Sequence, residues 1–324
     1  MITTQEALNI ILNKSKNIGI EQIDLSFSLD RVLAENIHSD VNVPAFNRSA
    51  MDGFAINSKD TSSKFQVIED VPAGKIPQKK IKFGQCARIM TGAMLPKGAD
   101  KVVKVEDTLQ LAANSMQLTV FDRKSNVSLK GEDVKCGKLV IKKGAVIRPQ
   151  EAAVLATVGK TKIKVFKKPT VAVISTGSEL VEPSLKPRLG QIRNSNGPMA
   201  IVQLKRLGIE GNYLGIAKDN FETTKKLVKK GLNTSDLLIL SGGVSVGDYD
   251  FVYEVLKSCG VKILFNKVAI KPGKPTTFGI KGKKLIFGLP GNPVSAMLIF
   301  ELFVVPAINK IENKNYKLNF SKCN

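Results

Sequence analysis

The apolar positions of the chain fall into three successive patterns, each typical of a different kind of structure. Near the N-terminus, Ala7 and Ile11 share one face of a helix, so we expect mixed helix and loop over residues 1–45. Residues 54–140 hold short apolar runs separated by glycine and proline, which predicts a small β domain. From residue 168 onward, continuous apolar runs alternate with helical segments, as in a parallel sheet buried on both faces.

These patterns predict an α/β fold class, with a three-layer α/β/α domain around a mostly parallel sheet. A helix opened by Pro149 leads the chain back towards its first segment, so we expect the β domain to be an insertion. The expected boundaries are residues 1–45 with 141–167 for a helical N-terminal linker domain, 46–140 for the β domain, 168–312 for the α/β domain and 313–324 for a polar tail.

The composition is that of a globular protein and excludes several kinds of site. Hydrophobic residues make up 43% of the chain and charged residues 24%, enough apolar side chains for real cores. Four cysteines lie far apart and there is one histidine, which argues against a structural zinc site, a disulfide framework and a Cys–His nucleophile. The longest apolar stretch, Val294–Ile308, is interrupted by Glu301 and Pro306, and the N-terminus lacks the pattern of a signal peptide. We therefore expect a cytoplasmic protein with no membrane partner.

The formal net charge of +21 is compatible with a nucleic acid, an acidic surface or an anionic small molecule as partner. Lysine supplies nearly all of this charge and is spread along the whole chain, whereas arginine favours bidentate phosphate or guanine recognition. Aromatic residues are only 6% and tryptophan is absent, so a base-stacking platform is poorly supported. The pattern favours a solvated lysine-rich surface over nucleic-acid binding.

Four unusual loops follow the expected strands of the α/β domain. Ligands of open α/β sheets bind beyond the carboxyl ends of the strands, and the four loops fall at that edge. They bring glycine, hydroxyl groups and charge, and free N–H groups at the helix starts that follow favour an anion. None matches the Walker A or dinucleotide pattern. The four loops are Ser175–Leu180, Ser241–Asp250, Ala269–Pro275 and Gly288–Ser295.

The charged residues of these loops allow two interpretations each. Three lysines within eight residues, partly restrained by a Pro-Gly pair, suit a tetrahedral oxyanion or a phosphate, or they form a solvated basic turn. The carboxylates suit magnesium, which prefers hard oxygen ligands, or they cap helices. The lysines are Lys267, Lys271 and Lys274, and the carboxylates are Glu179, Asp219, Asp248 and Asp250. In the N-terminal half, Asp52 before Gly53 is an ordinary turn former on its own.

Six motifs occur in an order that resembles one known family. They are Pro44-Ala-Phe-Asn-Arg-Ser-Ala-Met-Asp-Gly-Phe-Ala, Ile89-Met-Thr-Gly-Ala, Ser175-Thr-Gly-Ser-Glu-Leu, Ser241-Gly-Gly-Val-Ser-Val-Gly, Ala269-Ile-Lys-Pro-Gly-Lys-Pro and Gly288-Leu-Pro-Gly-Asn-Pro-Val-Ser. Together they look like the molybdopterin molybdenumtransferases of molybdenum cofactor biosynthesis, a family that includes the gephyrin E domain. The likeness covers nearly the whole chain, and six ordered motifs are far more specific than any one loop.

The resemblance implies a reaction, a cofactor and partners. Adenylated molybdopterin and molybdate would be the substrates, and Mg²⁺-dependent hydrolysis of the adenylate would accompany transfer of molybdenum, with release of AMP. An adenylyltransferase would be a further partner, since it would supply the adenylate. The family forms an elongated homodimer through its N-terminal domain, and its cleft pairs one subunit's α/β domain with the other's β domain.

The resemblance also assigns site residues, carried over motif by motif. Asp52 and Thr91 would belong to the catalytic cleft from the β domain. Glu179, Asp219 and Asp250 would form a catalytic acidic set that also holds the metal. Substrate, including molybdate or phosphate oxygens, would be bound by Ser241, Gly242, Gly243, Ser245, Lys267, Lys271, Lys274, Pro290, Asn292 and Ser295.

Two departures from the family pattern, and one other class of function, stay open. Arg48 stands where the family commonly has asparagine or another small polar residue. Family members usually continue with a C-terminal β domain, whereas only about a dozen residues follow the last expected helix. A non-catalytic molybdopterin-binding or scaffold protein is therefore the alternative to the enzyme.

Overall fold

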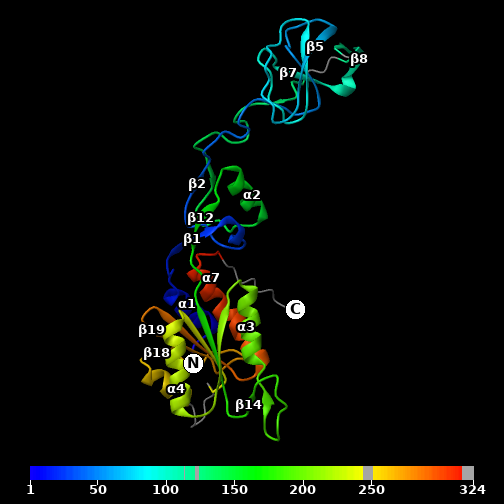
Figure 1. The fold of residues 1–324 in the computed structure, drawn as a ribbon. Helices are drawn as coiled ribbons and strands as arrows, with labels where there is room; N and C mark the ends of the chain where they lie inside the picture. The colour runs from blue at the N-terminus through cyan, green and yellow to red at the C-terminus, as the bar shows by residue number, and fades with distance from the viewer. Residues whose placement is uncertain (113, 121–123, 244–250, 316–324) are drawn as a thin grey trace. The chain divides into compact units, whose positions relative to one another are not determined.

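The computed structural model describes residues 1–112, 114–120, 124–243 and 251–315, which form two compact units. The first unit comprises residues 1–35, 143–152 and the chain from 161 onward, and the second comprises residues 36–142 and 153–160. The first unit holds the six-stranded sheet in which Figure 1 labels β18 and β19, and the second holds the sheet in which it labels β5, β7 and β8.

The first unit is built on a mixed six-stranded sheet. In spatial order its strands are β16 (Gly211–Ala217), β13 (Val171–Thr176), β17 (Leu237–Ser241), β20 (Lys284–Leu289), β19 (Thr277–Lys281) and β18 (Lys262–Phe265). The first four run parallel, whereas β19 is antiparallel to both of its neighbours. The expected α/β class is confirmed, and the sheet departs from a parallel one only through β19.

Helices cover both faces of this sheet because its strands alternate between two cores. Along β13, Val171 and Val173 belong to one core and Ala172 and Ile174 to the other. The first core is covered by α1 (Thr4–Lys14), α3 (Asn196–Arg206), α6 (Pro293–Ile299) and α7 (Val305–Ile311), and the second by α4 (Phe221–Thr234) and α5 (Phe251–Ser258). Figure 1 shows α4 and α3 on opposite sides of the sheet, which makes three layers.

The helix starts follow from capping side chains in the sequence. Thr3 opens α1 with a capping box: its hydroxyl accepts from Glu6 N (3.2 Å) and the Glu6 carboxylate accepts from Thr3 N (2.8 Å). Asn220 opens α4 by accepting from Thr223 N (3.1 Å). At the other end of a helix, the Lys168 ammonium donates to the carbonyls of Leu207 and Gly208 at the end of α3, both at 2.9 Å.

The last helical stretch is continuous to Ile311, as the sequence predicted. A π-helical turn, Phe300–Val304, joins α6 to α7, so Glu301 and Pro306 do not interrupt the helix. Among the described residues, Pro293–Ile311 is then the one helix with the length and apolar composition of a membrane span. Because 67% of its apolar window is buried against the rest of the protein, it serves here as a core helix.

The N-terminal segments are mixed α and β rather than helical as expected. Strand β1 (Ile20–Asp24) pairs antiparallel with β12 (Lys162–Phe166), because Ile163 and Val165 alternate with lysines and bury one face. Helix α2 (Pro149–Thr157) is present where Pro149 predicted it. Helix α1 contributes Ala7 and Ile11 to the core of the α/β sheet, so it belongs to that compact unit.

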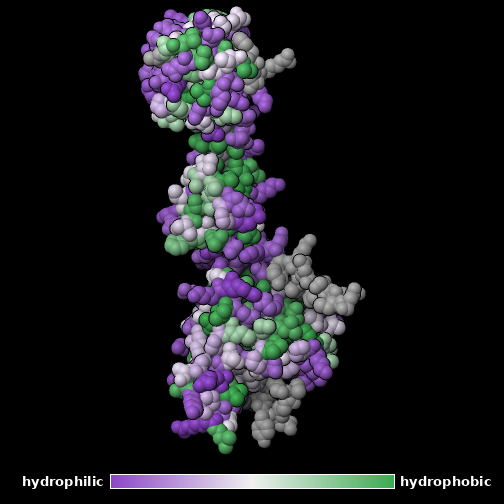
Figure 2. Space-filling model, turned by 90° about the vertical axis from the view of Figure 1, so that its right-hand side faces the viewer, coloured by the Kyte–Doolittle hydropathy of each residue, from purple (hydrophilic) through white to green (hydrophobic). Residues whose placement is uncertain are grey.

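The second unit is a β unit with two thin cores. Its sheet has the order β7 (Lys101–Lys104), β4 (Gly53–Ile56), β6 (Gln85–Ile89), β5 (Lys64–Val71), β9 (Ser115–Leu118) and β8 (Thr108–Ala112). Two short antiparallel pairs accompany it, β3 (Arg48–Ser49) with β10 (Val127–Ser128) and β2 (Ile37–His38) with β11 (Leu139–Ile141). Phe54 and Ala55 on β4 face opposite cores. Figure 2 shows one face of this unit, on which hydrophilic residues dominate and hydrophobic ones are scattered.

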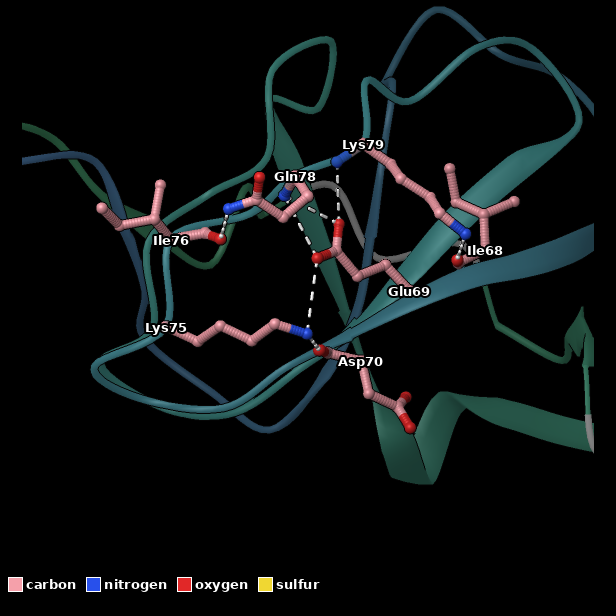
Figure 3. Close-up of polar contacts among 7 residues, drawn as sticks. All are labelled: Ile68, Glu69, Asp70, Lys75, Ile76, Gln78 and Lys79. Atoms are coloured by element: carbon pink, nitrogen blue, oxygen red, sulfur yellow. Dashed lines mark hydrogen bonds and ion pairs between the residues drawn. The ribbon is translucent and has the colours of Figure 1, made fainter.

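The loop after β5 is held by the carboxylate of Glu69 (Figure 3). That carboxylate accepts from the backbone N–H groups of Gln78 (3.1 Å) and Lys79 (2.9 Å), and the Lys75 ammonium lies 3.5 Å away. Burial opposes ionisation of Glu69, but these backbone donors and Lys75 outweigh it and hold its pKa below the ordinary value. The loop is therefore fixed to the sheet through one ionised side chain.

Candidate functional site

A cavity of about 930 Å³ opens at the carboxyl edge of the α/β sheet. It lies where the chain order reverses, since β13 has β16 on one side and β17 on the other. The loops after β13, β17 and β20 line it, together with the short strands β14 (Leu180–Val181) and β15 (Ile192–Arg193) and the start of α3. Its lining includes Thr176, Gly177, Glu179, Arg193, Asn194, Asn196, Asp219, Phe221, Ser241, Gly242, Gly243, Tyr253, Glu254, Gly291 and Pro293.

At the floor of the cavity, the backbone at Gly242 lies close to the backbone of Thr176. Its φ is +90°, and a Cβ atom there would lie 2.4 Å from the carbonyl oxygen of Thr176. Its N–H donates to Leu289 O (3.1 Å), and the Thr176 hydroxyl donates to Ser241 O (3.3 Å). A glycine at this position therefore lets the ends of three strands come together.

Carboxylates outnumber cations in the lining. Among the described residues it holds three carboxylates, Glu179, Asp219 and Glu254, and one cation, Arg193. Asp219 is fixed by a reciprocal pair of bonds with Ser178: its carboxylate accepts from Ser178 N and its own N–H donates to the Ser178 hydroxyl, both at 2.9 Å. An anionic ligand in this cavity needs further positive charge to offset these groups.

A buried polar network supports the cavity from below, and it was not predicted from the sequence. Asn194 accepts from the Ser175 hydroxyl (3.0 Å) and donates to the Tyr213 hydroxyl (2.7 Å), which in turn donates to Glu182 (2.9 Å). Burial, followed by the neighbouring Glu182 carboxylate, raises the pKa of Tyr213 to about 12. The tyrosine hydroxyl is thus kept protonated as a donor, which fixes the orientation of the Asn194 amide.

Several helix-start amides are already bonded to side chains. Gly197 N donates to Asn194 Oδ1 (3.1 Å) at the start of α3, and Ser295 N donates to Asn292 Oδ1 (3.1 Å) at the start of α6. Thr223 N at the start of α4 is capped in the same way. These N–H groups are not free for an anion as the sequence suggested, because the capping side chains take them first.

The predicted substrate-binding residues divide between two hollows. Ser241, Gly242 and Gly243 line the large cavity. Lys271 and Lys274 instead line a second hollow of about 320 Å³, which Met1, Val268, Ala269 and Ile270 complete. The separation follows from topology, because this loop joins the two strands beyond β20, and neighbouring strands lie about 4.8 Å apart.

The other predicted residues have the following places. Gly291 and Pro293 of the last loop line the cavity, whereas Pro290 is buried, Asn292 caps α6 and Ser295 is buried in its first turn. Lys267 is half-buried and its carbonyl accepts from Ile2 N (3.4 Å). Ser245, Asp248 and Asp250 lie outside the described residues. Within the part of the chain that the structure describes, no three His, Cys, Asp or Glu residues form a metal-binding group.

In the β unit, the two predicted residues are in direct contact. The Asp52 carboxylate accepts from both Thr91 N (2.6 Å) and Thr91 Oγ1 (2.7 Å). These two bonds, the backbone one first, hold the pKa of Asp52 below its ordinary value. The next residue must be glycine, because a Cβ at Gly53 would overlap the carbonyl oxygen of Val103 on β7. The Asp-Gly pair thus has a structural role beside any catalytic one.

Comparison with known proteins places this arrangement in a family. Residues 2–159 match a domain described as the MoeA N-terminal region (domain I and II), and residues 172–310 match a probable molybdopterin binding domain. A molybdopterin molybdenumtransferase from Staphylococcus epidermidis is 44% identical over 317 residues, which are 96% of this chain and 76% of that protein. The chain belongs to the molybdopterin molybdenumtransferase family. A Staphylococcus aureus relative of the same name is 41% identical over 95% of this chain and 75% of its own length.

A solved structure supports membership of the molybdopterin molybdenumtransferase family at the level of the fold. The molybdopterin biosynthesis MoeA protein from Pyrococcus horikosii superposes with a TM-score of 0.82 at 36% identity. The match covers 96% of this chain and 81% of the other. The large cavity therefore lies in the part of the chain that matches the family's probable molybdopterin binding domain.

Proposed function

We propose that this protein is a molybdopterin molybdenumtransferase, which inserts molybdenum from molybdate into adenylated molybdopterin and releases AMP. The observation that carries the proposal is the large cavity at the carboxyl edge of the sheet, lined by Glu179, Asp219 and the Gly242-Gly243 turn. Open α/β sheets bind nucleotide-like ligands at this position, and the family's members bear the name of this reaction. A separate adenylyltransferase would supply the adenylated substrate.

The acidic lining fits a bound magnesium ion. Mg²⁺ is commonly held by one or two carboxylates together with substrate phosphates and waters, so it does not need three protein ligands. Glu179 and Asp219 supply two carboxylates to one cavity, and these two residues would hold the ion. When bound, Mg²⁺ offsets the charge that develops on phosphate as an anhydride breaks.

The chain's own residues would orient the anionic substrate around these carboxylates. Arg193 is the cation of the described lining and is suited to a phosphate oxygen. The close backbone turn at Gly242 and Gly243 leaves room for the substrate to approach the strand ends. We assign molybdate to the hollow of Lys271 and Lys274, where two exposed ammonium groups meet a doubly charged oxoanion.

Asp52 and Thr91 are proposed to complete the cavity of a partner subunit in a homodimer. The two hydrogen bonds from Thr91 keep the Asp52 carboxylate ionised, as a group that binds a cation or accepts a proton requires. Mixing Asp52→Asn subunits with Asp219→Asn subunits tests this arrangement. Because a mixed dimer keeps one intact composite site, it should recover up to about half of the wild-type activity, whereas sites built within one chain would recover none.

The reaction itself is tested by AMP release. The full chain is incubated with adenylated molybdopterin, molybdate and Mg²⁺, and AMP is separated by chromatography. Asp219→Asn should lower turnover roughly 100-fold, because it removes one of the two carboxylates that would hold the cation beside the breaking anhydride. Glu222→Gln is the matched control, since Glu222 is an exposed carboxylate in the first turn of α4 outside the cavity lining. Ligand binding without AMP release by the wild type would reject the enzyme in favour of a scaffold.

A further inference from the structure

Two residues that line the large cavity each carry a buried polar atom without a hydrogen-bond partner among the described residues. They are Asn196 Oδ1 and Ser241 Oγ, and the residues that carry them are 8% and 2% exposed. A buried polar atom without a partner costs free energy, so such atoms in a native structure need an explanation. Here both belong to residues that line one hollow, which points to a ligand that supplies the missing bonds.

The two residues are neighbours across the cavity floor. The Asn196 amide nitrogen donates to Gly291 O at 2.8 Å. Gly291 in turn lies against Gly242, since a Cβ on Gly291 would be 3.8 Å from Gly242 Cα. Ser241 directly precedes Gly242 at the end of β17. The start of α3 and the end of β17 therefore bring these two residues to the same region of the cavity lining.

The bonding of Asn196 fixes which kind of group it can receive. Because its nitrogen is committed to a carbonyl, the oxygen is the atom left for the ligand, and an amide oxygen only accepts. Phosphate and molybdate oxygens are acceptors too, so they do not satisfy it. The Ser241 hydroxyl both donates and accepts. Asn196 and Ser241 together therefore suit a neutral ligand group that has an N–H donor, for the Asn196 oxygen, beside an acceptor, for the Ser241 hydroxyl.

We propose that Asn196 and Ser241 bind the donor–acceptor edge of the substrate's heterocycle and set the cavity's specificity for that ring. This inference rests on the proposed function, because adenylated molybdopterin offers two such edges: the amino-pyrimidinone of the pterin and the amino-pyrimidine of adenine. Both share the chemistry that the two residues recognise. The carboxylates and Arg193 deal with the charged part of the substrate, so recognition of the ring is a separate task.

Ser241→Ala is the sharpest test, because the hydroxyl makes no bond within the described protein. Its removal should leave the midpoint of thermal unfolding of the ligand-free protein unchanged or higher. The same change should raise the Kd for a ring-containing probe about 3- to 10-fold, the loss of one hydrogen bond. Asn196→Ala should raise the Kd by a similar factor.

Gln203→Met is the matched control for both variants. Gln203 lies on the same helix as Asn196, and its amide oxygen is also buried without a partner, but it does not line the cavity. Binding to the full chain is measured by calorimetry with three probes: AMP, pterin (2-amino-4-pteridinone) and ribose 5-phosphate. The control should bind all three as the wild type does. Ribose 5-phosphate lacks a ring edge, so its Kd should not change in any variant.

The outcomes separate this inference from the function on which it rests. A weaker Kd for AMP alone assigns the pair to adenine, and a weaker Kd for pterin alone assigns it to the pterin; either supports the proposal. Wild-type Kd values for both probes in Ser241→Ala and Asn196→Ala would overturn it, as would a lower unfolding midpoint of Ser241→Ala. If the wild type releases no AMP, the proposed function fails, whatever the variants bind.

Discussion

Replacing Gly242 with alanine tests whether the cavity floor requires a residue without a side chain. Gly242 has a φ of +90°, and an added Cβ would lie 2.4 Å from Thr176 O, a backbone atom that cannot move without shifting β13. Gly215→Ala provides the matched control. Gly215 lies on β16 with a φ of +100°, and its Cβ would meet nothing within 4 Å. The two variants share the backbone penalty and differ in the clash.

The expected magnitudes follow from these two terms. A left-handed backbone costs an ordinary residue about 1–2 kcal/mol, and this term applies to both variants. Overpacking against a fixed neighbour adds about 1–3 kcal/mol, and this term applies to Gly242→Ala alone. At about 3 °C per kcal/mol for a unit of this size, the melting temperature of Gly242→Ala should lie roughly 3–9 °C below that of Gly215→Ala.

Thermal unfolding of both variants and calorimetry of AMP binding measure the effects on stability and on the cavity separately. Gly242→Ala should lose AMP affinity as well as stability. The backbone at position 242 must shift to relieve the clash, and this residue lines the cavity next to Ser241. Gly215→Ala should keep the affinity of the wild type, since Gly215 does not line the cavity. Equal unfolding midpoints and equal affinities in the two variants would refute the close approach that the structure shows.

Three further predictions concern single charged groups. Thr91→Val removes one of the two donors to Asp52, so an NMR titration should show the pKa of Asp52 rising towards its ordinary value. The stability that the Asp52 carboxylate contributes is present above the pKa of the unfolded state and is lost as the pH falls through the pKa of the folded state. Lys168→Met should cost about 2 kcal/mol in urea unfolding, because it removes two charge-assisted bonds at the end of α3 and the positive charge that attracts buried Glu312; an unchanged midpoint would contradict this. Glu69→Gln should speed hydrogen exchange of the two backbone amides that the carboxylate accepts from, while exchange elsewhere in β5 stays slow; uniform acceleration would mean global unfolding instead.

The elements that the sequence predicted well are those with strong local signals. Val171–Thr176 and Leu237–Ser241 are continuous apolar runs, and each is a fully buried central strand. The Pro149 helix is marked by a residue that favours the first helical turn. Two strands of the six-stranded sheet went unpredicted, β16 and β19, which contain glycine and polar residues and lie beside more apolar strands. Their pairing depends on tertiary contacts that no short window contains.

The sequence predicted those site residues whose position follows directly from the ends of the parallel strands. Ser241 to Gly243, Glu179 and Asp219 were expected at the carboxyl edge, and they line one cavity. The network of Asn194 and Tyr213 was not predicted, because ordinary polar residues in a turn and a strand carry no signal until the fold brings them together. A search for buried residues with unpaired polar atoms finds Asn196, but burial is known only from the structure.

Lys271 and Lys274 line a different hollow from the one lined by Glu179 and Asp219, so the two hollows attract different ligands. The net charge of +21 favoured a solvated lysine-rich surface, and the loop lysines were expected to hold molybdate or phosphate oxygens alike. The described lining of the large cavity contains no lysine and three carboxylates, so its own field repels a phosphate unless a cation intervenes. None of the described residues that line the hollow of Lys271 and Lys274 carries a carboxylate. Under the proposed function, a divalent cation would bring the nucleotide phosphate to Glu179 and Asp219, and the two lysines would attract the free oxoanion. Salt should therefore weaken capture of molybdate by the exposed lysines far more than it weakens binding of the nucleotide, because Coulomb attraction at an exposed pair is screened over about 10 Å at 0.1 M.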